Sequence, residues 1–378
     1  MPVDAHEVFR SIFKADPAFV VRAPGRVNLI GEHTDYNEGF VLPMAIDRDI
    51  RIALRPRADA RVVVHSLDLD KRGEFDLDSF ERGTGWLEYI KGVAHELQIT
   101  KCQLSGWEGV LTGDVPRGAG LSSSAAVEIA TARAFAAVSD LTWDVMQMAR
   151  VGQRAEINWV GVDSGIMDQA ASAAAWAGHA FFLDCRSLEF EQVPLPNDIT
   201  VAVMDTSTRR GLVHSAYNER HRQCMEAARF FGVEFLRDVS VDQLEERGRK
   251  KDGLDDVAWK RARHVVTENE RVLRAVGSMR RDDPAALGKL FNESHASLRD
   301  DFEVTNDALN WIVEIAQARP DCYGARMTGA GFGGCAVALV RRESAGEFAD
   351  AVGAEYQSRA GMEAKVYVCQ ASEGASVV

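Results

Sequence analysis

The chain has 378 residues, of which 46% are hydrophobic and 27% charged, the composition of an ordinary globular protein. This length exceeds one comfortable hydrophobic core, so two domains are expected. The net charge of −13 argues against a broad surface for nucleic acid or for an anionic membrane. The six cysteines lack CxxC spacing, the first residues lack an apolar signal core, and the longest apolar stretch, 170–183, is too short to span a bilayer. We therefore expect a cytoplasmic protein with reduced thiols.

Hydrophobic periodicity predicts an N-terminal half that mixes strands with helices. The expected strands are 19–23, 39–55, 61–65, 107–112 and 179–184. The expected helices are 86–97, 122–138, one that runs from a cap at Thr142 to Gly161, and one over 165–176.

A shift in composition at 187–200, with Pro194 and Pro196, places the domain boundary, so we expect domains at 1–186 and 187–378. The second half is expected to contain strands at 200–205, 335–340 and 364–369, and helices near 215–231, 256–276, 284–298, 306–318 and 342–359. Strands and helices occur without strict alternation, which predicts the α+β class.

A glycine- and serine-rich loop, GDVPRGAGLSSSAA at 113–126, joins a short strand to a long helix. Gly118 and Gly120 let the backbone approach an anion, and the start of the helix offers unpaired N–H groups. These are the features that a polyphosphate site needs, although no lysine follows as in a Walker A loop. A plain glycine turn with serines that cap the helix fits the spacing equally well.

A polar turn, APGRVNLIGEHTDYNEG at 23–39, lies between two predicted strands. Its charged residues and histidine could hydrogen-bond several hydroxyl groups, as sugar recognition requires; they are Arg26, Glu32, His33 and Asp35. Arg26 could also stabilise charge on a transferring phosphoryl group. The alternative is a solvated turn with a surface ion pair.

Two acidic residues frame a glycine turn in GVDSGIMDQAAS, residues 161–172, and in the helix before it. Asp168 falls in the first turn of a helix, and Glu156 lies twelve residues earlier beside an apolar stripe. Together they could hold Mg²⁺ and orient a hydroxyl group. Spacing only permits this, because the helix dipole favours an acid at Asp168 and a solvated helix edge is usual for Glu156.

A second glycine-rich segment, MTGAGFGGCAVALV at 327–340, contains the GxGxxG pattern of dinucleotide-binding folds. No clear strand is expected before it, and CAVALV after it is typical of a strand rather than a helix. We therefore reject a dinucleotide site and expect a loop that packs against another loop or a ligand.

Three segments resemble motifs of one kinase family. Residues 25–39, GRVNLIGEHTDYNEG, closely resemble the galactokinase signature. Residues 116–126, PRGAGLSSSAA, resemble the phosphate loop of the wider family of galactokinases and of homoserine, mevalonate and phosphomevalonate kinases. Residues 327–334, MTGAGFGG, look like that family's third motif. The motifs occur in the family's order with similar spacing, so the resemblance covers nearly the whole chain.

This resemblance implies a two-domain fold, with an N-terminal mixed sheet that includes a left-handed βαβ crossover and a C-terminal ferredoxin-like domain. The active site would lie between them. Asp168 matches the acid beside the C1 hydroxyl of the sugar, and Arg26 the arginine next to that acid and to the γ-phosphate. The residues that match sugar ligands are Glu32, His33, Asp35, Gly165 through its backbone, and Tyr217.

On the nucleotide side, the resemblance implies a phosphate cradle made of Gly118, Ala119, Gly120, Leu121, Ser122 and Ser123. Ser124, at the end of the cradle, and Glu156 match Mg²⁺ ligands, and Trp86 matches an aromatic residue near the adenine. Many relatives carry Cys before Gly165, where this chain has Ser164, and we expect little effect on the chemistry.

The implied reaction converts galactose and ATP, with Mg²⁺, to α-galactose 1-phosphate and ADP, the first phosphorylation step of galactose catabolism. We expect a monomer whose partners are these small molecules. One alternative is a related sugar 1-kinase, for N-acetylgalactosamine, arabinose or galacturonate. Another is a non-catalytic galactose sensor. Such sensors lose residues from the serine-rich loop, whereas residues 122–126 are all present here, which favours the enzyme.

Overall fold

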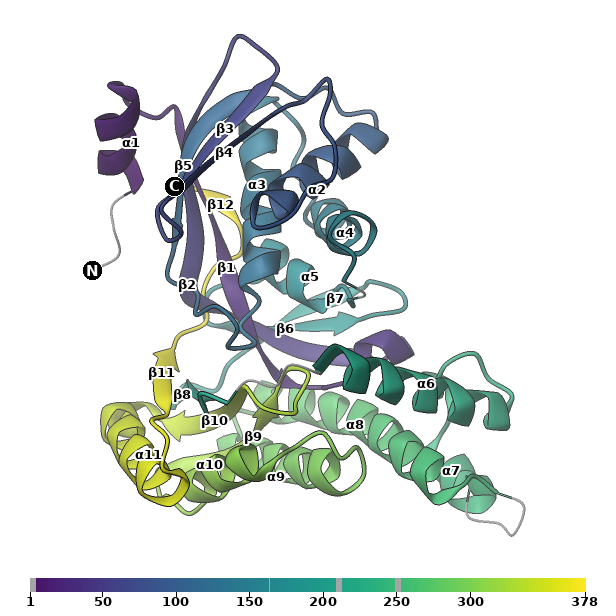
Figure 1. Cartoon of the computed structure of the whole chain (residues 1–378). Coiled ribbons are helices and arrows are strands. Elements are labelled where there is room, and N and C mark those ends of the chain that lie inside the picture. The colour runs from purple at the N-terminus through teal and green to yellow at the C-terminus, as the bar shows by residue number, and fades with distance from the viewer. Residues whose placement is uncertain (1–4, 163, 209–212, 249–252) are drawn as a thin grey trace.

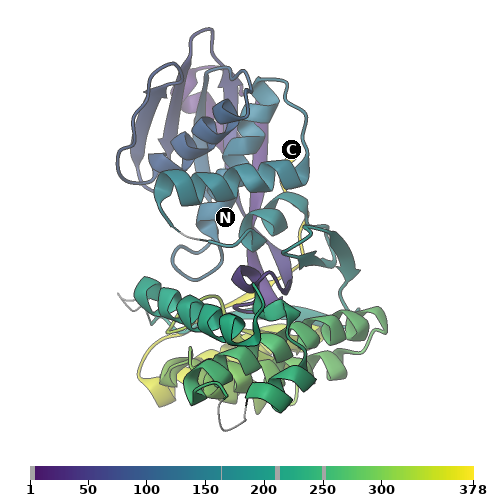
Figure 2. The ribbon, with the colours of Figure 1, turned by 90° about the vertical axis from the view of Figure 1, so that its right-hand side faces the viewer.

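The computed structural model describes residues 5–162, 164–208, 213–248 and 253–378. They form two layered parts, one above the other, and the long strand β1 runs from the upper part down to the lower one (Figures 1 and 2). The predicted α+β architecture, with an N-terminal mixed sheet and a C-terminal domain of strands and helices, is confirmed.

Among the described residues, the upper sheet has eight strands, in the order β12-β1-β2-β5-β3-β4, with β6 paired to β2 and β7 paired to β6. These strands are β1 (Phe19–Ile30), β2 (Phe40–Pro56), β3 (Arg61–Ser66), β4 (Lys71–Asp76), β5 (Trp107–Gly113), β6 (His179–Asp184), β7 (Phe190–Pro194) and β12 (Ser376–Val377). The pair β3 and β5 is parallel, and a parallel pair needs a crossover connection, which here runs through β4 and α2.

Helices cover both faces of this sheet (Figure 1). One face carries α2 (Leu87–Ile99), α3 (Ser123–Val138), α4 (Val145–Arg154) with the π-helical turn η2 (Ala155–Val160), and α5 (Met167–Ala174). The other face carries α1 (Ala5–Phe13), which packs on β2 and β5. Asp144 caps α4 by accepting a hydrogen bond from the backbone N–H of Gln147. The predicted cap at Thr142 is therefore wrong by two residues.

The lower sheet has four antiparallel strands among the described residues, in the order β11-β8-β10-β9. They are β8 (Ile199–Asp205), β9 (Cys322–Thr328), β10 (Cys335–Arg341) and β11 (Lys365–Cys369). The helices are α6 (Val213–Phe231), α7 (Val241–Gly248), α8 (Asp256–Arg280), α9 (Pro284–Asp300), α10 (Asp307–Gln317) and α11 (Ala345–Ala360). With α11 between β10 and β11, this order is that of a ferredoxin-like domain.

Side chains alternate along β8 and β10 between two hydrophobic cores. Val201, Val203 and Val337 belong to the core of the upper part, whereas Ala202 and Ala338 belong to the core shared with the lower helices. The lower sheet is thus apolar on both faces and packs directly against the upper part. This contact fixes the two parts against each other at the place where β1 ends.

Two segments return to the upper sheet after the predicted domain boundary at 186/187. Strand β7 pairs with β6, and β12, at the end of the chain, pairs with β1. The predicted boundary therefore falls in the turn between β6 and β7. The chain crosses to the lower sheet only after Pro194, where β7 ends.

One expectation about the second glycine-rich segment is wrong. Strand β9 directly precedes the glycines of this segment, although no strand was expected there. The dinucleotide interpretation still fails, because the segment leads into strand β10 instead of a helix. Elsewhere, none of the described helices is both long enough and apolar enough to cross a membrane.

Candidate active site

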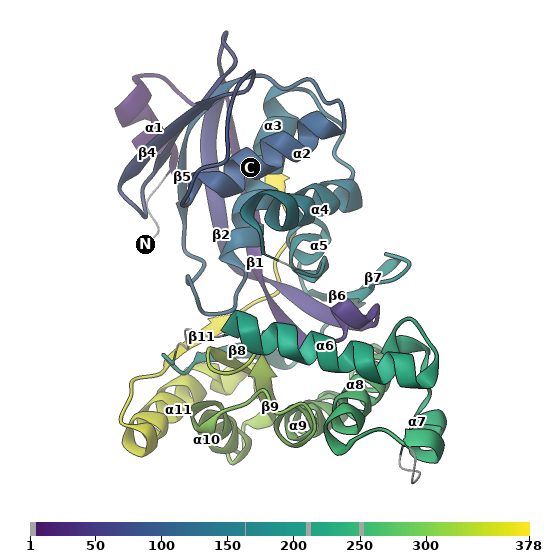
Figure 3. The same ribbon diagram turned by 45° about the vertical axis from the view of Figure 1, so that its right-hand side comes forward.

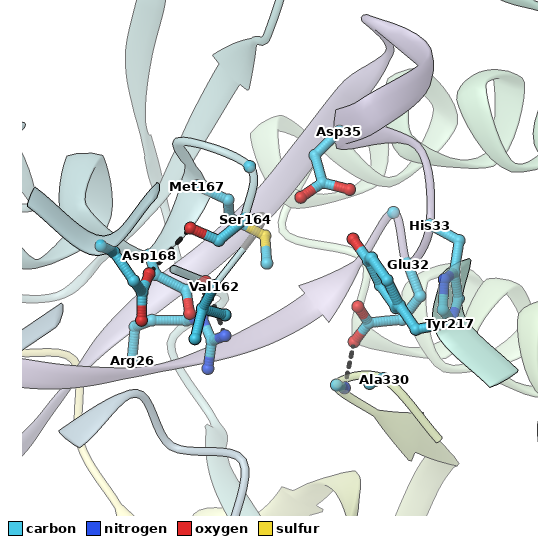
Figure 4. Close-up of a pocket in the computed structure, with 14 residues that line it drawn as sticks. Arg26, Glu32, His33, Asp35, Val162, Ser164, Met167, Asp168, Tyr217 and Ala330 are labelled. Carbon is cyan, nitrogen blue, oxygen red and sulfur yellow. Dashed lines mark hydrogen bonds and ion pairs between the residues drawn. The ribbon is translucent and has the colours of Figure 1, made fainter. Parts of the chain in front are cut away.

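The sugar-binding, catalytic and acidic residues expected from the sequence gather around one cavity of about 240 Å³. Figure 4 shows Arg26 and Asp168 on one side of it, with Glu32, His33 and Tyr217 on the other and Asp35 between the two groups. Glu156 and Gly165 also line the cavity. The predicted residues therefore lie together, although they come from β1, the loop after it, η2, the loop before α5, α5 itself and α6.

Asp168 is held at the centre of the site by residues of two other segments. Arg26, from β1, donates from Nε to Asp168 Oδ1 at 2.7 Å, and its Nη2 lies 2.6 Å from the same oxygen. The hydroxyl group of Ser122 donates to the other oxygen, Oδ2. Arg26 also donates from Nη1 to the backbone oxygen of Gly120 at 2.7 Å. The carboxylate is therefore fixed between the sugar cavity and the phosphate loop.

The phosphate loop presents its backbone because its apolar side chains point into the core. Ala119 and Leu121 are almost completely buried. Gly118, Gly120 and Ser122 have positive φ angles of 70°, 72° and 55°, so the chain turns sharply before α3. The side chain of Ser122 makes no capping hydrogen bond, which leaves the first N–H groups of α3 available to an anion.

A second cavity, of about 400 Å³, lies beside the phosphate loop. Ser123 and Ser124 line it together with Trp86, the residue before α2, and with Tyr89 and Arg117. The predicted adenine-side residue Trp86 is thus next to the predicted phosphate residues. Tyr89 and Arg117 were not predicted, although Arg117 lies within the phosphate-loop motif at 116–126.

Gly165 is required by the space that Asp35 occupies. A Cβ atom at Gly165 would lie 2.1 Å from Asp35 Oδ2, far inside van der Waals contact. Burial raises the pKa of Asp35 to about 6. Burial also lowers the pKa of His33 well below its usual range, so His33 is neutral at pH 7. The ring of His33 packs between Tyr217 and Phe302, at centroid distances of 5.7 and 4.7 Å.

Glu32 connects the sugar loop to the second glycine-rich segment. Its Oε1 accepts hydrogen bonds from Thr328 Oγ1 and from the backbone N–H of Gly329, both at 2.8 Å. Gly329 and Ala330 also line the cavity. The expectation that this segment packs against another loop is confirmed, and its sequence motif was the signal for these two lining residues.

Glu156 is buried near the phosphate loop, and three side chains hold its carboxylate. Its Oε2 accepts from Ser164 Oγ at 2.8 Å and from Gln169 Nε2 at 2.9 Å, while Ser124 hydrogen-bonds the same carboxylate. Burial raises the pKa of Glu156. No cluster of three or more His, Cys, Asp or Glu side chains that could hold a metal occurs in the described part of the chain. A metal at Glu156 and Ser124 would therefore need further ligands from water or from a substrate.

Comparison with known proteins decides the family. The galactokinase galactose-binding signature matches residues 7–56, and the N-terminal and C-terminal domains of GHMP kinases match residues 88–175 and 275–358. The chain is 45% identical to a galactokinase of Roseiflexus sp. (strain RS-1), over 98% of this chain and 96% of that protein. The chain belongs to the galactokinase family.

Two further comparisons agree with this assignment. The galactokinase of Actinobacillus succinogenes (strain ATCC 55618 / DSM 22257 / CCUG 43843 / 130Z) is 42% identical over 97% of both chains. The crystal structure of Lactococcus lactis galactokinase complexed with galactose superposes with a TM-score of 0.92 at 36% identity, and the match covers 99% of this chain and 98% of that one. As a galactokinase, the chain is an ATP-dependent phosphotransferase, and the predicted enzyme class is confirmed.

Proposed function

We propose that this galactokinase transfers the γ-phosphoryl group of ATP to the C1 hydroxyl of galactose, with Asp168 and Arg26 at the reacting atoms. The observation that carries the proposal is the position of Asp168. Its carboxylate lines the sugar cavity and is bonded at the same time to Ser122 of the phosphate loop. A sugar hydroxyl that contacts Asp168 would therefore lie next to a phosphate bound at the start of α3.

The sugar is bound by the polar side chains across the cavity from Asp168. Glu32 and Asp35 offer carboxylate oxygens that accept hydrogen bonds from sugar hydroxyls. His33 and Tyr217 add polar atoms on aromatic rings, and Gly165 contributes its backbone. Recognition by hydrogen-bonding groups gives strong selectivity, because a sugar that lacks the matching hydroxyl leaves a buried partner unpaired.

The reaction is an in-line displacement that depends mainly on positioning. The C1 oxygen attacks the γ-phosphorus, the bond to the β,γ-bridging oxygen breaks, and ADP leaves. Asp168 accepts the proton of the C1 hydroxyl. Arg26, at 2.6 Å from Asp168, orients the carboxylate and stabilises the charge on the transferring group.

The nucleotide lies along the phosphate loop, from Gly118 to Ser124, with its base toward Trp86 in the adjoining cavity. Ser124 and Glu156 would hold Mg²⁺, because hydroxyl and carboxylate oxygens are the ligands that this cation prefers. A site with so few protein ligands fits a cation that is also bound by substrate phosphates. When bound, Mg²⁺ would neutralise charge on the β- and γ-phosphates.

Release of ADP across a panel of sugars tests the substrate. We expect galactose to give the highest kcat/KM, and ³¹P NMR of the product to show a phosphate on C1. Faster turnover of N-acetylgalactosamine, arabinose or galacturonate would assign the enzyme to a related sugar 1-kinase. Galactose binding without ADP release above the ATP-only blank would instead indicate a sensor.

The proposal extends to a monomer that works in the cytoplasm, as the net charge of −13 and the absence of CxxC spacing among the cysteines favour. Light scattering of the purified protein measures the mass directly, and a value near 41.5 kDa is expected.

A further inference from the structure

The sugar-binding loop, residues 31–39, leaves the upper part of the molecule and lies against helix α8 of the lower part. Figure 3 shows the segment after β1 above α6 and α8. Three polar side chains of α8, which are buried and unused by the proposed mechanism, face this loop: His264, Glu268 and Asn269. Positions 264 and 268 are one helical turn apart, so both lie on the same face of α8.

Two of these side chains hold the beginning of the loop through its backbone. Glu268 Oε1 accepts a hydrogen bond from the N–H of Gly31 at 3.0 Å. His264 Nε2 lies 3.1 Å from the backbone oxygen of Glu32. Since a carbonyl oxygen only accepts, Nε2 of His264 carries the proton and donates. Gly31 and Glu32 are thus fixed immediately before the cavity-lining residue His33.

The third side chain holds the end of the loop. Asn269 Oδ1 accepts from the N–H of Phe40 at 2.9 Å. Within the loop, Thr34 Oγ1 lies 2.9 Å from the oxygen of Gly31 and 2.7 Å from that of Phe40, which ties the two ends together. Helix α8 therefore contacts both ends of a loop whose middle carries His33 and Asp35.

The charge of Glu268 is buried and neutralised. Arg271 Nε donates to Glu268 Oε2 at 2.6 Å, and Ser294 Oγ donates to Oε1 at 2.7 Å. Burial raises the pKa of Glu268, but the positive charges, chiefly Arg271, outweigh this effect and lower the pKa to about 2. A buried ion pair contributes little net stability compared with apolar packing, so stability alone does not account for this one.

We propose that Glu268 and Asn269 are positioning residues for sugar binding. From α8 they hold the two ends of the sugar loop at the spacing that lets Glu32, His33 and Asp35 line the cavity. Neither is among the described residues that line it, so both act through the loop backbone. The inference rests on the proposed sugar-binding role of the loop.

The test compares Glu268→Ala and Asn269→Ala, each of which removes one acceptor at one end of the loop. The matched control is Glu270→Ala, an exposed residue on the same helix. Steady-state assays give kcat and the two KM values, and calorimetry gives the Kd for galactose without ATP. We expect KM and Kd for galactose to rise about tenfold, because each variant loses one buried hydrogen bond that holds the loop. KM for ATP should stay within about twofold of wild type, and Glu270→Ala should change neither KM.

A rise in KM for galactose without a rise in KM for ATP distinguishes a positioning role from general destabilisation of the protein. A galactose Kd that stays at the wild-type value in either folded variant would overturn the inference, and so would an equal rise in both KM values. If Glu268→Ala fails to fold, Asn269→Ala carries the test alone, because it removes no charge. Failure of the proposed function gives a different result, in which wild type itself neither binds nor phosphorylates galactose.

Discussion

The two sides of the active site are built in opposite ways. The phosphate loop turns on Gly118 and Gly120 and offers mainly backbone N–H groups, while its apolar side chains anchor it in the core. The sugar side offers the side chains of Glu32 and Asp35, and buried charges on α8 and β9 surround the loop that carries them. Asp168 lies between the two sides and is bonded to the phosphate side.

This difference shows where specificity resides. Backbone groups at a helix start bind any phosphate of suitable shape, because they carry no side-chain information. Side chains at fixed positions distinguish one sugar hydroxyl from another, but only if their loop keeps its position. Substitutions on the sugar side should therefore change galactose kinetics, those in the phosphate loop should change ATP kinetics, and those at Asp168 should change kcat.

The largest effect is expected for Asp168→Asn. The amide keeps the shape of the carboxylate but cannot accept the proton of the C1 hydroxyl, so kcat should fall by about 10²- to 10⁴-fold. Galactose binding measured by calorimetry should persist, and circular dichroism should show an intact fold. A variant that retains near-wild-type turnover would remove Asp168 from the chemistry and place the proton acceptor elsewhere.

Gly165→Ala should act on the sugar side alone. The new Cβ would lie 2.1 Å from Asp35 Oδ2, so the Asp35 carboxylate must move. A displacement of this size is expected to raise KM for galactose about 10- to 100-fold, with KM for ATP unchanged. Gly353→Ala, in α11, is the matched control, because nothing lies within 4 Å of its added Cβ. Unchanged galactose kinetics in Gly165→Ala would contradict a role for Asp35 in binding.

Gly120→Ala tests the opposite side of the comparison. Nothing lies within 4 Å of the added Cβ, but a φ of 72° costs an L-residue about 1–2 kcal/mol. The strain should shift the loop and raise KM for ATP about tenfold, while the galactose Kd stays near wild type. An equal change in both substrates would mean that Asp168 transmits the loop's displacement through Ser122, and the two sides would then not be separable.

The sequence predicted the long elements because periodicity and helix caps are local signals. Helices such as α3 and α10 were placed within a few residues. Strand β9 was missed because CYGARMT lacks alternation, and β12 is too short to show any. Strand β12 is defined by its pairing with β1, more than 300 residues away, whereas β9 pairs with the neighbouring strand β10.

For the site, the motifs predicted the residue types, and the family resemblance predicted that they meet. Spacing alone could not show that Glu156 and Asp168 line one cavity. The positioning role of Glu268 and Asn269 could not be predicted from the sequence, because polar residues on a helix normally indicate a solvated face. Their contacts with Gly31 and Phe40 span more than 200 residues and depend on how the two parts of the molecule pack.

The smallest expected effect concerns stability and pH at Asp35. Burial raises its pKa from 3.8 in the unfolded chain to about 6 in the folded one. Between these values the folded state keeps a proton that the unfolded chain releases, so the residue's contribution to stability falls as pH rises through this window. Asp35→Asn should therefore raise Tm by about 2 °C or more at pH 7.5, and the gain should disappear toward pH 4.

The same titration should affect sugar binding in wild type. Below about pH 6 the Asp35 carboxyl group is protonated and accepts hydrogen bonds poorly, so KM for galactose should rise as pH falls from 7.5 to 5.5. Asp35→Asn should bind galactose weakly at every pH, with a flatter profile. An increase in Tm that is equal at pH 4.5 and 7.5 would indicate a pKa close to that of the unfolded chain. The buried carboxylate of Asp35 would then not lower the stability of the folded state at neutral pH, and the sugar side would not differ from the phosphate loop in this respect.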